Sequence, residues 1–131
     1  MEIKYNEATL NRPEGDRIID APFVFIDLKK YGSQLLQEEA WIKNDRNGIT
    51  VYKTDGYTMV LSCLKEGALL EDNIVDGLIT MQVMQGAIDF TIETGTVSVK
   101  KQQMITVHGG IMHTIKAVED TMLLITSKVE R

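Results

Sequence analysis

Apolar and polar residues alternate over much of the second half of the chain. Every second residue is apolar in much of the runs 78–86 (LITMQVMQG) and 87–95 (AIDFTIETG). These apolar residues are Ile79, Met81, Val83, Ile88, Phe90 and Ile92. Side chains of a strand point to opposite faces in turn, so a period of two predicts strands with one buried face. Each of these two runs is therefore predicted to be a strand with its apolar set in the core.

Similar short runs continue to the end of the chain. The runs TVSVKK, QMITV, HTIKAV and TMLLITSKV lie within 96–129 and are rich in β-branched residues. Earlier runs are AWIKND (40–45), ITVYKT (49–54) and YTMVLSCLK (57–65), separated by Asn47-Gly48 and by Asp55-Gly56. These dipeptides favour two-residue hairpin turns, because both positions tolerate positive φ. The pattern predicts an antiparallel meander with Trp41 in an edge strand.

Only one segment has a helical period. In 27–39 (DLKKYGSQLLQEE) the apolar positions Leu28, Tyr31, Leu35 and Leu36 follow a spacing near 3.6, and Asp27 is placed to cap the N-terminus. Gly32 weakens this short helix. Many strands, one helix and no strand–helix alternation predict an all-β fold, either a sandwich or a small barrel.

Composition narrows the class of protein. The chain has 131 residues, 44% hydrophobic and 25% charged, which fits one globular domain. A net charge of −5 and 6% aromatic residues argue against nucleic acid as a partner. No apolar run approaches the roughly 18 residues of a membrane span and the start is polar, so we expect a cytoplasmic protein that does not bind membranes. The single cysteine, Cys63, is predicted to be a buried apolar residue.

Both histidines lie in HGGIMH, 108–113, on either side of a Gly-Gly pair. The alternation in HTIKA places His113 on the same face as Ile115 and Ala117, so its imidazole is predicted to point inward. His108 follows the strand MITV, where an imidazole bonded to nearby backbone is the simpler interpretation. An inward histidine is either a core residue satisfied by one hydrogen bond or a functional group.

Two stretches resemble the conserved motifs of the cupin superfamily. Gly67–Gly86 (GALLEDNIVDGLITMQVMQG) has the flanking glycines and spacing of the first motif, and Gly95–Ala117 is similar to the second, with Gly110 and His113 at its glycine and histidine. The resemblance implies a cupin double-stranded β-helix, or jelly roll, with a short N-terminal helix. It also implies a single domain over 1–131, with an arm and helix over about 1–40 and the conserved barrel over about 49–127.

The metal-ligand positions of the cupin motifs are largely replaced in this chain. They read Asn73, Val75, Ile79 and His113, where metal-binding members have three histidines and a carboxylate. An amide, a valine and an isoleucine do not provide the imidazole, thiolate or carboxylate donors that transition metals need. No metal cofactor is therefore favoured. If a divalent metal does bind, the candidate ligands are His113, His108, Asn73 and Glu71.

The favoured function is a metal-independent module that binds a small organic ligand in an apolar barrel cavity. Five candidate ligand-binding residues follow from strand parity and from the motif positions: His113, Asn73, Met81, Met59 and Ile79. The alternative is a small-molecule enzyme of the isomerase, dioxygenase or decarboxylase type, with a metal held around His113, which is also the best catalytic candidate. A third possibility is a dimerising scaffold, and the resemblance implies a homodimer.

Overall fold

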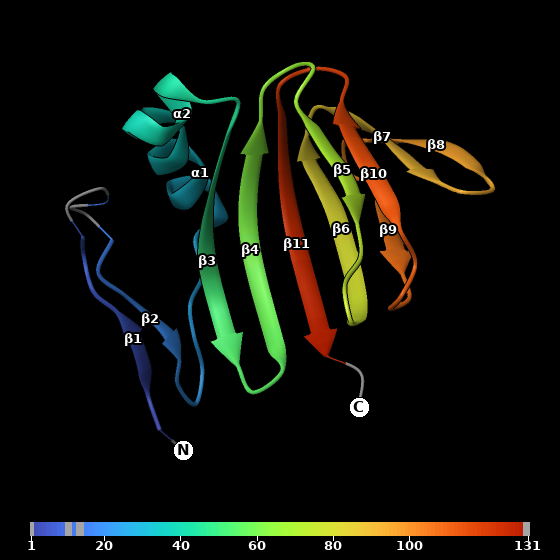
Figure 1. Cartoon of the computed structure of the whole chain (residues 1–131). Helices are drawn as coiled ribbons and strands as arrows, with labels where there is room; N and C mark the ends of the chain where they lie inside the picture. The colour runs from blue at the N-terminus through green and yellow to red at the C-terminus, as the bar shows by residue number, and fades with distance from the viewer. Residues whose placement is uncertain (1, 10–11, 13–14, 130–131) are drawn as a thin grey trace.

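The computed structural model describes residues 2–9, 12 and 15–129, with only the backbone of Asp72. Two β-sheets form its main body, and an N-terminal hairpin and two short helices lie at one side (Figure 1). No helix within the described residues is long and apolar enough to cross a membrane. The hairpin consists of β1 (Lys4–Asn6) and β2 (Arg17–Asp20).

The first sheet has five strands in the order β3-β4-β11-β6-β9. Their bounds are β3 Arg46–Thr54, β4 Tyr57–Leu64, β6 Gly77–Gln85, β9 Met104–Val107 and β11 Thr121–Val129. The second sheet has four strands in the order β5-β10-β7-β8. Their bounds are β5 Leu69–Asn73, β7 Ala87–Ile92, β8 Gly95–Lys100 and β10 His113–Ala117. All neighbouring strands are antiparallel, which confirms the predicted all-β class.

The main core lies between the two sheets. It is formed by inward side chains of both: Leu64, Ala68, Ile79, Met81, Val83, Ile88, Phe90, Val99, Val107, Ile115, Ala117 and Leu123. Its members from β6, β7 and β10 are the alternate residues that the sequence pattern placed inward. Ile92, at the end of β7, is only partly buried but packs against the same core. Burial of one apolar face on each sheet is the main stabilising contribution.

A second core covers the outer face of the five-stranded sheet. Helix α1 (Leu28–Gln37) packs on β3 and β4, and its Leu35 is fully buried with Ile49, Leu61 and Cys63. Asp27 caps α1, accepting a hydrogen bond from the Lys30 N–H at 3.1 Å, as predicted. The two cores therefore lie on opposite faces of the five-stranded sheet, and α1 covers the outer one.

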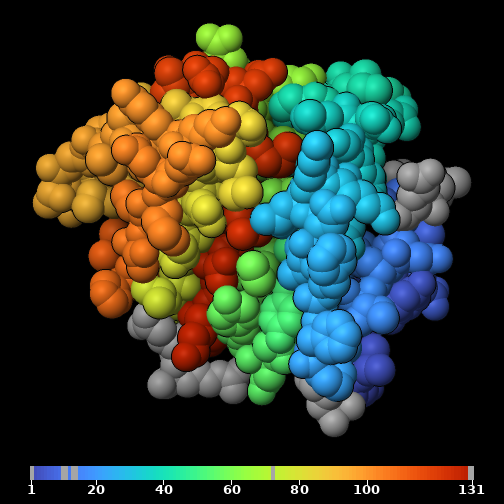
Figure 2. All heavy atoms as spheres, turned by 180° about the vertical axis from the view of Figure 1, so that it is seen from behind, coloured from blue at the N-terminus to red at the C-terminus, as the bar shows by residue number. Residues whose placement is uncertain are grey.

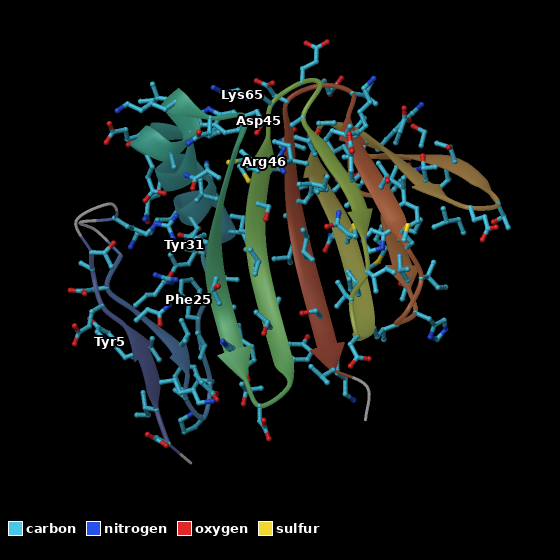
Figure 3. The ribbon with its side chains drawn as sticks, in the orientation of Figure 1. Tyr5, Phe25, Tyr31, Asp45, Arg46 and Lys65 are labelled. Atoms are coloured by element: carbon cyan, nitrogen blue, oxygen red, sulfur yellow. The ribbon has the colours of Figure 1, made fainter. Side chains whose placement is uncertain are left out.

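The segment 40–45 was wrongly predicted as a strand. Its first four residues belong to a second helix, α2 (Glu39–Lys43). Trp41 of this helix packs against the second core. The Lys65 ammonium lies 5.1 Å from the centre of the Trp41 ring, a cation–π contact. Figure 3 shows Lys65, Asp45 and Arg46 grouped at this end of the sheet. Trp41 therefore joins the helices to the sheet instead of forming an edge strand.

The Asn47-Gly48 hairpin was also wrong, whereas the Asp55-Gly56 hairpin is confirmed. Asn47 and Gly48 lie inside β3, paired with Cys63 and Ser62 of β4. The Asn47 side-chain amide donates to the Leu35 carbonyl at 3.0 Å, so this residue ties α1 to the sheet instead of forming a turn. The pattern also gave no indication of β1, β2 and β5.

Candidate functional site

His113 is the first residue of β10 and only 3% of it is exposed, which confirms that it faces inward. Its ring stacks on Phe90 of β7, with ring centres 5.5 Å apart and an interplanar angle of 21°. Its Nδ1 lies 3.0 Å from the carbonyl oxygen of Ile111. A carbonyl oxygen can only accept, so Nδ1 carries the proton. These two contacts fix the plane and the tautomer of the imidazole.

The second ring nitrogen of His113, Nε2, makes no hydrogen bond to any of the described residues, and it is not among their fully buried unpaired atoms. In the neutral ring with Nδ1 protonated, Nε2 is an acceptor; in the charged ring it is a donor. The site can therefore accept a hydrogen bond from a ligand, or donate one after protonation.

The glycines of HGGIMH allow two loops to pack closely beside His113. A Cβ at Gly109 would lie 2.8 Å from the backbone nitrogen of Gly77, closer than a side-chain carbon can approach. Gly110 has φ +79°, and its N–H donates to the Val75 carbonyl at 3.0 Å. The loop before β10 is thus held against the loop before β6.

A surface cleft of about 780 Å³ opens beside His113. It lies between the turn that joins β7 to β8 and the loop that enters β10, and its lining residues are Ile74, Thr91, Ile92, Glu93, Thr94, Gly110, Ile111, Met112, His113 and Thr114. The surface of the lining is mainly apolar, and its apolar side chains are Ile74, Ile92, Ile111 and Met112. A mainly apolar cleft with a few polar groups is the usual form of a small-molecule site.

The structure brings only part of the predicted ligand-binding set to this cleft. Asn73 is paired with His113 between β5 and β10, but Ile74, not Asn73, lines the cleft. Ile79 and Met81 are buried in the main core, away from its lining. Met59 lies in the second core, under α1 on the opposite face of the sheet, because its parity in β4 matches Leu61 and Cys63. Met59, a candidate ligand-binding residue by sequence, therefore lies away from the cleft.

The candidate metal ligands do not form a cluster. Glu71 is exposed on β5, and His108 is exposed just after β9, where it has a partner of its own. No group of three or more His, Cys, Asp or Glu side chains able to hold a metal ion occurs within 2–9, 12 and 15–129. Val75, at one of the motif's histidine positions, is exposed and apolar. The described donors do not fit a tightly held transition metal.

Sequence reasoning missed most of the cleft lining. Ile111 and Met112 are exposed between the glycines and β10, outside any strand alternation. Thr94 belongs to the turn 93–94, which the sequence pattern included in the predicted strand 87–95, and nothing local indicates that this turn lies opposite the 110–112 loop. The one sequence signal for Ile111 and Met112 is that they lie next to His113, which was predicted to point inward.

Cys63 is buried as predicted. Its thiol donates to the Asn47 carbonyl at 3.4 Å, and desolvation by burial raises its pKa to about 11. At neutral pH the group is therefore protonated and unsuited to act as a nucleophile. It belongs to the core under α1, not to the cleft.

Comparisons with known proteins identify the fold. No family model matches the chain, and no curated protein matches its sequence. A conserved protein of unknown function from Streptococcus pyogenes superposes with a TM-score of 0.68 at 20% identity, covering 86% of this chain and 92% of that one. A cupin superfamily protein from Desulfitobacterium hafniense superposes with a TM-score of 0.69 at 12% identity, covering 97% and 99%.

An enzyme has the same architecture within a longer chain. A mutant form of salicylate 1,2-dioxygenase from Pseudoaminobacter salicylatoxidans superposes with a TM-score of 0.72 at 15% identity, over 86% of this chain but 37% of the enzyme. The TM-scores establish a common fold. At identities this low, the chemistry of each site must be argued from its own residues. The two sheets, their strand order and these superpositions show that this chain has the jelly-roll fold of the cupin superfamily.

Proposed function

We propose that this protein binds a small organic molecule, without a metal ion, in the cleft beside His113. The observation that carries the proposal is an imidazole held by Phe90 and by the Ile111 carbonyl, whose Nε2 has no hydrogen-bond partner among the described residues and lies beside an apolar cleft. The apolar lining contributes binding energy through burial, and Nε2 orients the one polar group of the ligand.

The tautomer defines the ligand that this site recognises best. Because Nδ1 donates to the Ile111 carbonyl, the neutral ring presents an acceptor to the cleft. Glu93 also lines the cleft, and its negative charge disfavours an anionic ligand there. The site therefore suits a neutral, largely apolar molecule with one hydroxyl or N–H donor.

Phenol and toluene are suitable probes, because they differ by one hydroxyl donor and have the same ring. We expect phenol to shift the His113 and Met112 NMR signals and to bind several-fold more tightly than toluene at pH 8, since one net hydrogen bond contributes about 1 kcal/mol. In His113→Phe, which keeps an aromatic ring against Phe90, the two probes should bind equally. His108→Ala should behave as wild type. Equal binding of both probes to wild type would contradict the proposal.

Metal content decides between this proposal and the alternative of a metal-dependent enzyme. We expect protein purified without chelator or nickel resin to contain well under one equivalent of iron, manganese, nickel or zinc by mass spectrometry. Added divalent ions should leave the melting temperature unchanged. Near-stoichiometric metal that is lost in His113→Phe would overturn the proposal in favour of an enzyme with an imidazole-bound ion.

A further inference from the structure

Strands β8 and β9 are edge strands of the two sheets, and they lie on the same side of the main core. Each has a single neighbour among the described strands, β7 for β8 and β6 for β9. Figure 1 and Figure 2 show the β7–β8 hairpin projecting from the body of the molecule, beyond β9; it lies at the left edge of Figure 2. Part of the inner face of this hairpin therefore extends past the opposite sheet.

Val97 shows that the main core is incompletely covered along β8. It pairs directly with Phe90, just as Val99 pairs with Ile88. Directly paired residues of antiparallel strands have their side chains on the same face, so both valines point inward with Phe90 and Ile88. Val99 is 3% exposed, but Val97 is 48% exposed. The inner face of β8 is therefore covered near Val99 and open towards the turn 93–94.

A cleft of about 240 Å³ occupies this opening, and we call it the β8–β9 cleft. Its apolar walls are Phe90 and Ile92 of β7, Val97 of β8 and Ile105 of β9. Ile105 pairs with the buried Met81, so it points inward as well, and it packs against the main core. The cleft is therefore an extension of the main core that is open to solvent.

The β8–β9 cleft adjoins the cleft beside His113. Ile92 and Thr94 line both clefts. Phe90 lines the β8–β9 cleft and also stacks on the His113 ring. Along β8, the residues from Gly95 to Val97 extend the lining by about 7 Å at the usual rise of a strand. Together the two clefts follow the inner face of the β7–β8 hairpin away from the imidazole, over a length that suits several CH2 groups.

Ionisable side chains lie at only one end of this pair of clefts. His113 and Glu93 line the first cleft, whereas none of the described residues that line the β8–β9 cleft has an ionisable side chain. The Thr96 hydroxyl in the β8–β9 cleft is already hydrogen-bonded to the Thr91 hydroxyl at 2.8 Å. A ligand that fills both clefts would therefore have its polar group at His113 and apolar atoms between β8 and β9.

We infer that the ligand is a single-chain amphiphile with a neutral head, such as a primary alcohol, and that its alkyl chain lies in the β8–β9 cleft. This inference rests on the proposed binding at His113, where Nε2 accepts a hydrogen bond from the head. The chain removes inward-facing apolar surface, including that of Val97, from water. Glu93 and the net charge of −5 disfavour the carboxylate head of a fatty acid.

NMR titrations with 1-butanol and 1-octanol at pH 8 test this inference, because the two alcohols have the same head and differ by four CH2 groups. Both should shift the His113 ring signals. Full burial of one CH2 group strengthens binding about four-fold, so in this half-open cleft 1-octanol should bind at least about 20-fold more tightly than 1-butanol. The terminal methyl group of bound 1-octanol should give nuclear Overhauser effects to the methyl groups of Val97 and Ile105.

Val97→Asp introduces a carboxylate beside the chain, and it should reduce the preference for 1-octanol to a few-fold while 1-butanol binds as in wild type. The matched control is Val118→Asp, because Val118 is 45% exposed and lines neither cleft. It should keep the wild-type preference. Val97→Thr keeps the shape and the strand propensity of valine, and its preference should lie between those of wild type and Val97→Asp.

The outcomes separate this inference from the proposed function. Equal binding of the two alcohols, with the same shifts of the His113 signals, would overturn the inference and leave the proposed function standing. If neither alcohol shifted these signals, the proposed function would fail and the inference with it. A preference for 1-octanol that persists in Val97→Asp, without Overhauser effects to Val97 or Ile105 in wild type, would also overturn the inference, because the chain would then lie elsewhere.

Discussion

Glu38 is the most strongly hydrogen-bonded carboxylate among the described residues. It lies between α1 and α2 and accepts from Arg12 Nε at 2.9 Å and Nη2 at 2.8 Å, and also from Gln34 and Asn47. Partial burial raises the pKa of Glu38, but the hydrogen bonds from Arg12, Asn47 and Gln34 outweigh it and lower the pKa to about 2. The carboxylate joins the N-terminal arm, the helices and β3.

This pKa predicts an acid-sensitive contribution to stability. The folded pKa lies below the unfolded value of 4.5, so the contribution is complete above about pH 4.5 and is lost as pH falls towards 2. The difference corresponds to roughly 3 kcal/mol at most. In urea unfolding at pH 6, 4 and 3, wild type should lose more free energy of unfolding than Glu38→Gln.

The matched control is Glu39→Gln, which removes an exposed ion pair with Lys43 one helical turn away. Exposed pairs of this kind contribute about 0.5 kcal/mol or less, so the control should follow the wild-type pH dependence. Parallel curves for wild type and Glu38→Gln would show that the Arg12 contact is too weak to lower the pKa.

His113 shows what sequence predicts about a single residue. Its burial followed from alternation with Ile115 and Ala117, because strand parity is a local property. Its acceptor tautomer depends on the Ile111 carbonyl, and the cleft depends on a turn about 20 residues away along the chain. The direction of the side chain could therefore be predicted, whereas its neighbours across the cleft could not.

At the scale of elements, prediction succeeded where the pattern was long and regular. Strands β6, β7 and β11 have alternation or β-branched runs over most of their length. The ends of the predicted strands differ from the observed ends by a few residues at most. Helix α2 has five residues, too few for a helical period to appear, so its apolar Trp41 and Ile42 were read as a strand. Asn47-Gly48 has a turn composition, but pairing with β4 overrides it.

Helix α1 contains a correctable weakness at Gly32. This glycine is in the helix interior, and a Cβ there would meet Met122 Cε at 3.4 Å, an ordinary contact with a flexible side chain. Alanine is favoured over glycine in a helix by about 1 kcal/mol. Gly32→Ala should therefore raise the free energy of unfolding by about 0.5–1 kcal/mol, measured in urea at a fixed protein concentration.

Ser33→Ala provides the comparison for Gly32→Ala, because Ser33 is exposed in the same helix and reports propensity without packing. It should stabilise by less than about 0.5 kcal/mol. A destabilised Gly32→Ala beside a neutral or stabilised Ser33→Ala would mean that Met122 cannot move and that the helix lies too close to the sheet.

At the scale of the whole molecule, the five-stranded sheet couples the two cores. Adjacent residues of β11 contribute to both: Leu123 points into the main core, and Leu124 packs against the core under α1. The sheet cannot separate from α1 without exposing one apolar face, or from the second sheet without exposing the other. Both cores should therefore unfold together.

Two substitutions test this coupling. Leu123→Ala and Leu35→Ala each truncate a fully buried leucine, one in each core, and each should cost about 2–5 kcal/mol. Trp41 fluorescence reports the core under α1, and the His113 ring NMR signal reports the main core. In urea at one protein concentration, each variant should lower the unfolding midpoint equally for both probes. If Leu35→Ala shifted only the Trp41 transition, the helices would unfold independently of the barrel, and α1 would be an addition to the jelly roll instead of part of its cooperative unit.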